Sequence, residues 1–213
     1  METDKLIAML SRDAGPVAAG TVGRRYGAAL AAGGAGAVLL MLAFLGIRPD
    51  LAQAARDPMF WVKLALPCAL LAVALVAATR LARPGARVGH AAEALVVPIG
   101  AIWALAGVAL FAAPPGERLD LVLGETWAVC PFNIAMLSLP AFAAAFWAMR
   151  GLAPTRPALA GAFSGLLAGA VGAAAYCLHC PEMAPPFLGT WYRLGMALPA
   201  AAGAAAGPLL LRW

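Results

Sequence analysis

The chain has 213 residues, of which 63% are hydrophobic and 12% are charged, and its mean hydropathy is +0.85. A soluble domain carries roughly 25% charged residues, so this composition excludes a soluble globular protein and predicts an integral membrane protein. The formal net charge is +5. The basic residues are spread over the ends of apolar segments and form no stripe with aromatic partners, which argues against direct nucleic-acid binding.

The first 26 residues carry charges throughout and contain no apolar stretch typical of a signal peptide, so we expect the first apolar segment to be a retained helix. Within them, Thr3 can cap a short helix that Gly15 and Pro16 end. Its apolar side consists of Leu6, Ile7, Met9 and Leu10. Because an isolated helix of this length is marginal in water, it is expected to pack on the membrane surface, on the rest of the chain, or on a partner protein.

Six later segments are long and apolar enough to cross a bilayer, for which about 20 residues are needed. They span approximately residues 27–47, 60–78, 91–113, 129–149, 158–178 and 191–211. The short connections between them leave no room for a second folded domain. The sequence therefore predicts an all-α, polytopic membrane protein, with an N-terminal segment at residues 1–26 and one six-helix transmembrane bundle at residues 27–213.

The positions of Lys and Arg predict the orientation of the bundle. Ten of these fifteen residues precede the first segment, lie in the second or fourth connection, or follow the last segment. Since loops rich in Lys and Arg remain in the cytoplasm, we expect both termini to be cytoplasmic. Lys63 is one of the five on the opposite side, and it lies close enough to the predicted boundary for its side chain to snorkel to the surface.

Small residues recur at four-residue intervals in the last two segments. They are Gly161, Gly165 and Gly169 in the fifth, and Gly203 and Gly207 in the sixth. Such spacing lets two helix backbones approach closely in lipid. It predicts tight packing between helices inside the bundle, with a dimer interface as the alternative.

The reactive chemistry of the sequence is concentrated in its cysteines. Cys68 lies in the middle of a segment, where a thiol behaves as a small hydrophobe. Cys130, Cys177 and Cys180 all map to the outer boundary, on the side opposite the predicted cytoplasmic termini. If the cell is bacterial, that compartment is oxidising and favours disulfides between paired thiols.

Two of these thiols form a motif that could bind a metal. Cys177 and Cys180 enclose His179, and Glu182 follows them. Together with Cys130, these residues would supply three sulfurs, an imidazole and a carboxylate, a credible set of ligands for a soft metal. From the residues alone, a structural role, redox or metal sensing, and thiol-exchange catalysis all remain open.

Other activities find little support in the sequence. His90 and His179 are expected on opposite sides of the membrane and cannot share a catalytic site. Deeply placed ionisable residues and a duplicated half-sequence, which are typical of transporters, are not found. We expect no enzyme and no small-molecule substrate. A small transporter and a quinone-coupled thiol oxidoreductase remain the alternatives, although the latter normally exchanges two cysteine pairs and the outer side has only three thiols.

Several motifs along the chain resemble the NrsF family of bacterial membrane anti-sigma factors. They are Asp4-Lys5-Leu6-Ile7, Asp13, Pro16-Val17, Cys130-Pro131, the stretch from Tyr176 to Glu182, Trp191-Tyr192 and Leu211-Arg212-Trp213. The resemblance covers essentially the whole chain and is strongest from Cys130 onward. It implies a multi-pass protein of the bacterial inner membrane that sequesters an extracytoplasmic-function sigma factor.

The resemblance also implies roles for particular residues. The cytoplasmic N-terminal segment would bind the sigma factor through Asp4, Leu6, Ile7, Leu10 and Asp13. Two periplasmic cysteines, Cys130 and Cys180, would sense heavy-metal or oxidative stress and trigger release. Cys177 is not part of that pair in the family, and we keep Cys177, His179 and Glu182 as candidate accessory residues. No resident cofactor is implied, only a heavy-metal ion held transiently by Cys130 and Cys180.

Overall fold

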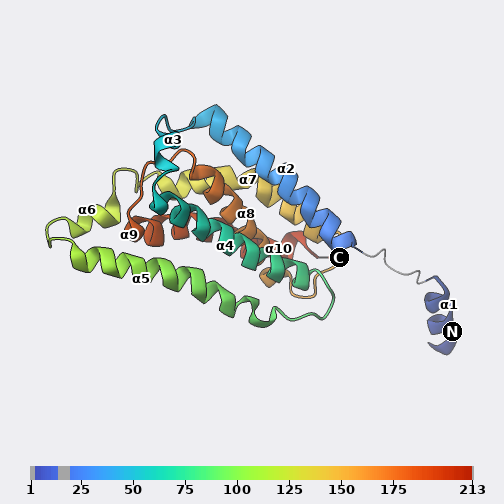
Figure 1. Cartoon of the computed structure of the whole chain (residues 1–213). Coiled ribbons are helices and arrows are strands. Elements are labelled where there is room, and N and C mark those ends of the chain that lie inside the picture. The colour runs from blue at the N-terminus through green and yellow to red at the C-terminus, as the bar shows by residue number, and fades with distance from the viewer. Residues whose placement is uncertain (1–2, 14–19, 213) are drawn as a thin grey trace.

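The computed structural model describes residues 3–13 and 20–212, without the side chains of residues 6 and 10–13. All regular elements in this part of the chain are helical (Figure 1). The α-helices are α1 (Thr3–Asp13), α2 (Thr21–Phe44), α3 (Leu51–Ala54), α4 (Pro58–Leu81), α5 (Val96–Ala112), α6 (Arg118–Leu123), α7 (Cys130–Arg150), α8 (Pro157–Tyr176), α9 (Pro185–Phe187) and α10 (Arg193–Leu210). Two 3-10 helices, η1 (Gly89–Ala91) and η2 (Glu93–Leu95), precede α5, and a π-helical turn, η3 (Leu188–Tyr192), joins α9 to α10.

Five helical stretches are long and apolar enough to cross a membrane, which confirms the prediction of an all-α membrane protein. They are Thr21–Phe44, Pro58–Leu81, Gly89–Ala112, Cys130–Arg150 and Pro157–Tyr176. Each overlaps one of the first five predicted segments. The sixth segment falls on η3 and α10, where a π-helical turn precedes Arg193, and it is not among the five. A sixth span therefore stays a prediction.

Helix α8 is the centre of the bundle. Within the apolar windows of the five stretches, 72% of the residues are buried in α8 but only 11% in the stretch that contains α5. Helices α10, α7, α4 and α2 all pack against α8. Helix α5 lies along the rim, where Val108 and Phe111 are largely exposed, as expected for side chains that face lipid.

Glycines allow the close approach of α8 to its neighbours. A Cβ atom at Gly161 would collide with the carbonyl oxygen of Gly203 on α10, and one at Gly165 would collide with that of Pro199. On another side of α8, a Cβ atom at Gly172 would lie 2.7 Å from the carbonyl oxygen of Ile134 on α7. The four-residue glycine pattern therefore serves packing inside the bundle, as predicted.

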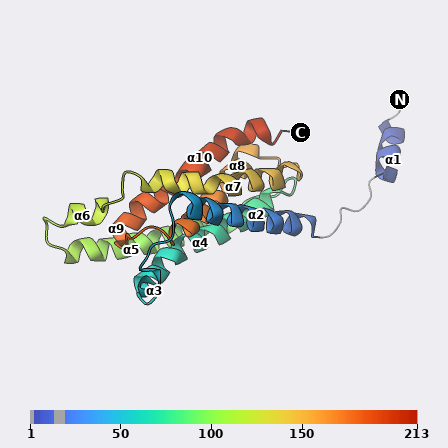
Figure 2. The ribbon, with the colours of Figure 1, turned by 90° about the horizontal axis from the view of Figure 1, so that it is seen from above.

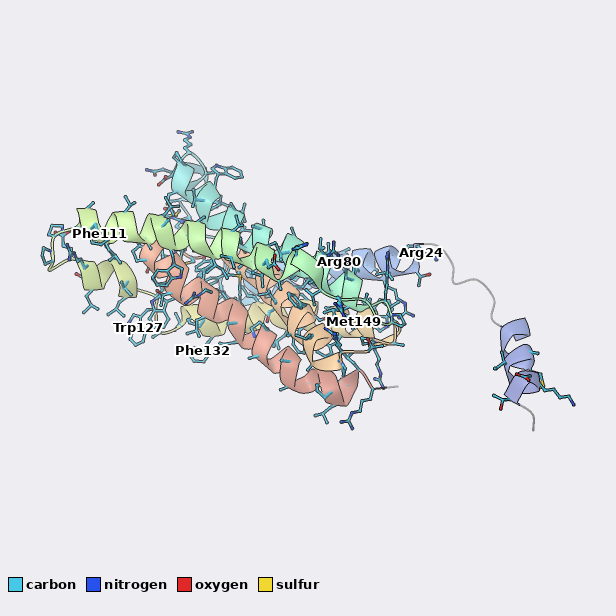
Figure 3. The ribbon with its side chains drawn as sticks, turned by 90° about the horizontal axis from the view of Figure 1, so that it is seen from below. Arg24, Arg80, Phe111, Trp127, Phe132 and Met149 are labelled. Atoms are coloured by element: carbon cyan, nitrogen blue, oxygen red, sulfur yellow. The ribbon has the colours of Figure 1, made fainter. Side chains whose placement is uncertain are left out.

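The bundle has two distinct ends. At one of them α2 ends, α4 and α7 begin, and α3, α6 and α9 lie nearby (Figures 1 and 2). We call this the cysteine end, because Cys130, Cys177 and Cys180 are there. The opposite end, where α2 begins and the chain ends, is called the arginine end. Figure 3 labels Arg24 and Arg80 on that side and Phe111 and Trp127 towards the cysteine end.

The short predicted N-terminal helix is present as α1, with Asp4 in its first turn. Ile7 and Met9 are 59% and 60% exposed, and α1 is drawn apart from the bundle (Figure 2). Leu6, Leu10 and Asp13 were also predicted to bind a partner, and their side chains lie outside the described residues. Of the four residues on the apolar side of α1, the structure therefore describes the side chains of Ile7 and Met9, and both are exposed.

Candidate thiol site

Three cysteines from two helix ends come together at the cysteine end. Cys130 opens α7, Cys177 follows the last residue of α8, and Cys180 lies three residues further on, in the segment that leads to α9. All three are completely buried in one apolar cluster, and all three are free thiols. Cys68, in contrast, is exposed on the side of α4.

Lys63 on α4 is the residue that sequence reasoning placed wrongly. Its side chain does not reach the surface but is completely buried. The ammonium group donates to the carbonyl oxygens of Cys180 at 2.6 Å and Glu182 at 2.9 Å, and it lies 5.3 Å from the centre of the Tyr192 ring. The carbonyl groups of the folded segment 180–182 accept hydrogen bonds from the buried ammonium group. Because this segment is distant in sequence, the residues of α4 could not have predicted these acceptors.

The main chain of Lys63 is also bound by the cysteine segment. Pro67, one turn further along α4, has no N–H and therefore leaves the carbonyl oxygen of Lys63 without its helical partner. The thiol of Cys177 donates to this oxygen across 3.9 Å. Neighbouring groups commonly satisfy carbonyls that a proline frees within a membrane helix. Cys177 therefore has a structural task, which the C-x-x-C spacing did not suggest.

Arg48 provides a second cation at the same carbonyl group. Its guanidinium donates to the carbonyl oxygen of Cys180 at 3.2 Å and makes two 2.7 Å hydrogen bonds to the carboxylate of Asp50. These hydrogen bonds hold the pKa of Asp50 below its ordinary value. Arg48 thus has a carboxylate partner, whereas Lys63 has none within ion-pairing distance in the described part of the chain.

His179 and Glu182 are engaged by the protein itself. The Nδ1 atom of His179 lies 3.0 Å from the carbonyl oxygen of Gly46, so this nitrogen donates a proton. One carboxylate oxygen of Glu182 accepts from the backbone N–H groups of Glu125 and Thr126, at 2.7 Å and 3.0 Å, and from the Thr126 hydroxyl at 3.2 Å. Glu182 therefore fastens the cysteine segment to the turn that precedes α7.

Two tyrosines complete the surroundings of the thiols. The Tyr176 hydroxyl is 3.4 Å from the side-chain amide of Asn133 and lies near the Cys180 thiol. The Tyr192 hydroxyl is beside the thiols of Cys177 and Cys180 but has no hydrogen bond of good geometry. A buried hydroxyl without a partner is unusual.

The described residues contain no group of three or more His, Cys, Asp and Glu side chains arranged to hold a metal ion. The structure brings together Cys130, Cys177 and Cys180, whose sulfur ligands suit a soft metal. It turns Glu182 and the Nδ1 atom of His179 towards backbone groups instead.

The sequence matches the NrsF family, described as "Negative regulator of sigma F", over residues 10–213. The "Probable anti-sigma-F factor NrsF" of Azospira oryzae is 52% identical to it over 213 residues, and the "Anti-sigma-F factor NrsF" of Caulobacter vibrioides is 44% identical over 216 residues. Both alignments cover 100% of the two chains compared, so they include α1 and the thiol site. No solved structure is significantly similar to the chain.

Proposed function

Because the chain belongs to the NrsF family of negative regulators of sigma F, we propose that it is an inner-membrane anti-sigma factor whose cysteine end senses stress. Membership of this family makes the chain a regulatory protein rather than an enzyme and gives it a sigma factor as partner. Family membership therefore favours an anti-sigma factor over the two alternative functions, a thiol oxidoreductase and a transporter. The proposal concerns the class of sigma factor, the stimulus and the arrangement in the membrane.

The charge pattern supports an arrangement with the arginine end in the cytoplasm and the cysteine end in the periplasm. Arg24 and Arg80 lie at the arginine end (Figure 3), Arg25 is next to Arg24 in α2, and Arg150 is the last residue of α7. Loops rich in Lys and Arg stay in the cytoplasm. We propose that η3 and α10 form the sixth span, since α10 runs beside the spanning helix α8 through glycine contacts. Both termini are then cytoplasmic.

The cytoplasmic partner is an extracytoplasmic-function sigma factor, held through α1. The exposed side chains of Ile7 and Met9 give α1 an apolar side of the kind that docks into a groove on a soluble protein. Asp4 lies in the first turn and offers a charged contact next to that side. Docking would order the segment and bury its apolar residues.

The observation that carries the sensing proposal is the burial of Cys130 and Cys180 in one site at the end opposite α1. Two chemical events could join the thiols. In one, a soft metal ion binds both sulfurs and displaces their two protons. In the other, an oxidant takes two electrons as the thiols lose two protons and form a disulfide. Either event changes the packing of α7 against the end of α8 and releases the sigma factor.

A sigma-dependent reporter tests this proposal. Cells would be exposed to Cd²⁺, a soft metal ion, or to diamide, a thiol oxidant, and reporter output would be compared among variants. The Cys130→Ser and Cys180→Ser double variant should keep the reporter silent under both agents. Cys68→Ser removes the exposed thiol of α4 and is the matched control, with induction expected as in the wild type. Normal induction of the double variant would refute sensing by this pair.

A further inference from the structure

Lys63 is a buried cation whose charge is balanced in an unusual way. A buried charge is normally paired with an opposite charge, because its transfer from water is costly. In the described part of the chain, the ammonium of Lys63 is held by two backbone carbonyls and the face of Tyr192 instead. Its position in the interior therefore depends on the continued presence of those two carbonyl oxygens.

Both carbonyl oxygens belong to the segment that carries Cys180. One is the carbonyl of Cys180 itself, so the thiol proposed to react and the acceptor of the shorter bond are on the same residue. The other is the carbonyl of Glu182, two residues further on. A movement of the Cys180 sulfur towards Cys130 acts directly on a main chain that holds Lys63. Displacement of these carbonyls would leave the buried ammonium without acceptors.

Helix α4 connects Lys63 to the opposite end of the bundle. The distance along the helix axis from Lys63 to Leu81 is about 27 Å at 1.5 Å per residue. Near that end, Ala78 and Leu81 are buried in one cluster with Tyr26 of α2. In the sequence, only seven residues, 14–20, lie between the end of α1 and the start of α2. A change in the tilt of α4 would therefore reach the helix that follows the sigma-docking segment.

Helix α4 is also better able to move than α8, although both meet at the thiol site. Helix α8 packs backbone to backbone against α10 at Gly161 and Gly165 and against α7 at Gly172, with no room even for a Cβ atom. Helix α4 contains Pro67, which removes one helical hydrogen bond directly after the Lys63 turn. Proline positions are where membrane and soluble helices bend.

We propose that Lys63 is the positioning residue that transmits the state of the cysteine pair to α4, through its hydrogen bonds to the carbonyls of Cys180 and Glu182. This inference rests on the proposed function of Cys130 and Cys180. In the reduced protein the carbonyls hold Lys63 and fix the first turns of α4. When the thiols are joined, the carbonyls of Cys180 and Glu182 move and leave the ammonium of Lys63 without acceptors. Helix α4 then bends so that this ammonium group is solvated again.

The test replaces Lys63 by methionine in the full-length protein in its own membrane. Lys63→Met has nearly the same length but no charge and no donor, and Lys63→Arg keeps both. For each variant, two quantities are measured after diamide treatment: the fraction of Cys130 and Cys180 that resists maleimide alkylation, and the induction of the sigma-dependent reporter. Membrane levels are compared by immunoblotting. Arg193→Met is the matched control, because it removes a cation that packs on Trp103 and not on the cysteine segment.

We expect Lys63→Met to repress the sigma factor normally and to form the cysteine cross-link, yet to fail in induction. Couplings between sites are typically about 5- to 150-fold, so the induction ratio should fall by a factor in that range, to near unity. Lys63→Arg and Arg193→Met should remain inducible. Lys63→Gln provides a second uncharged variant if Lys63→Met does not accumulate in the membrane, with the same expected loss.

Three results would overturn the role of Lys63. They are normal induction in Lys63→Met, a high reporter signal without diamide in both uncharged variants, and loss of the cross-link itself. The second would make Lys63 a structural residue, and the third would make it a determinant of thiol reactivity. Loss of induction in Arg193→Met would likewise show that any missing cation has this effect. Failure of the sensing proposal is separate, because it appears as induction in the Cys130→Ser and Cys180→Ser variant with Lys63 intact.

Discussion

The cysteine end and α1 differ in how their polar and apolar groups are satisfied. At the cysteine end, Lys63 and Glu182 form hydrogen bonds with groups from distant parts of the chain, and Lys63 and the three thiols are buried. In α1, the apolar side chains of Ile7 and Met9 are exposed. The buried groups of the first region can move only if internal contacts break. The second region presents apolar side chains outward, and this difference suits the sensing and docking roles that we propose for them.

This contrast predicts that variants of the two regions affect different measurements. Changes in α1 should alter reporter output without inducer and leave the reactivity of the cysteines unchanged. Changes at the cysteine end should alter thiol reactivity or the induction ratio while repression persists. A variant that moved both quantities together would weaken the assignment of separate roles.

The largest effect is expected from replacing Leu6, Ile7 and Leu10 together by glutamine. This keeps helix propensity but removes apolar area, and burial of each such side chain contributes about 1.5–3 kcal/mol. The sigma factor should be free without inducer, with a fully active reporter and an unchanged alkylation rate of the cysteines. Ala8→Gln in the same helix is the control and should repress. Recovery of a stable complex with the triple variant would disprove docking through this side.

A smaller effect is expected from Glu182→Gln. The carboxylate accepts three hydrogen bonds from Glu125 and Thr126. Loss of its charge should weaken the binding of the cysteine segment to the turn before α7 by about 1–2 kcal/mol. The turn before α7 would then open more often and expose Cys130. We expect faster alkylation of Cys130 by maleimide, with repression intact. An unchanged rate would mean that access to the thiol does not pass through this turn.

The smallest effect is expected at Cys177, which distinguishes a structural thiol from a sensing one. Cys177→Ala leaves the Lys63 carbonyl without a partner and should lower the free energy of unfolding by about 0.5–1 kcal/mol, because a thiol is a weak donor. Cys177→Ser keeps a donor and should cost less. Both variants should remain inducible by diamide, as judged by the reporter. If Cys177→Ser abolished induction while its membrane level was normal, Cys177 would belong to the sensing set.

Much of the fold could be predicted from local patterns. The apolar segments anticipated five of the spanning stretches, and the spacing of Gly161, Gly165 and Gly169 anticipated the contact with α10. The sixth predicted segment is divided between the π-helical turn η3 and the 18 residues of α10, and it is not among the five. The predicted boundary after residue 26 differs from the start of α2 at Thr21, since a helix can extend beyond the apolar core with Arg24 and Arg25 at its polar end.

The candidate site was predictable only in part. The positions of Cys130, Cys177 and Cys180 at helix ends placed them on one side of the bundle, and the structure does bring them into one cluster. The burial of Lys63 was not predicted, although the sequence contains a signal for it. Lys63 is the one cation in the first half of α4, and no acidic residue lies three or four positions away to pair with it. Such a charge needs a partner from another element.

The sequence by itself determined the membrane character of the chain, the helical segments and the separation of the cysteines from the N-terminal helix. These properties follow from transfer free energy and helical periodicity, which depend on residues near one another in the chain. The tertiary structure decided which groups meet. Lys63 is held by carbonyls more than 100 positions away, Cys177 satisfies an oxygen that Pro67 leaves free, and Glu182 binds the turn before α7. The partners of buried polar groups are set by packing, because any carbonyl or N–H group of the chain could serve, and only the folded arrangement selects one.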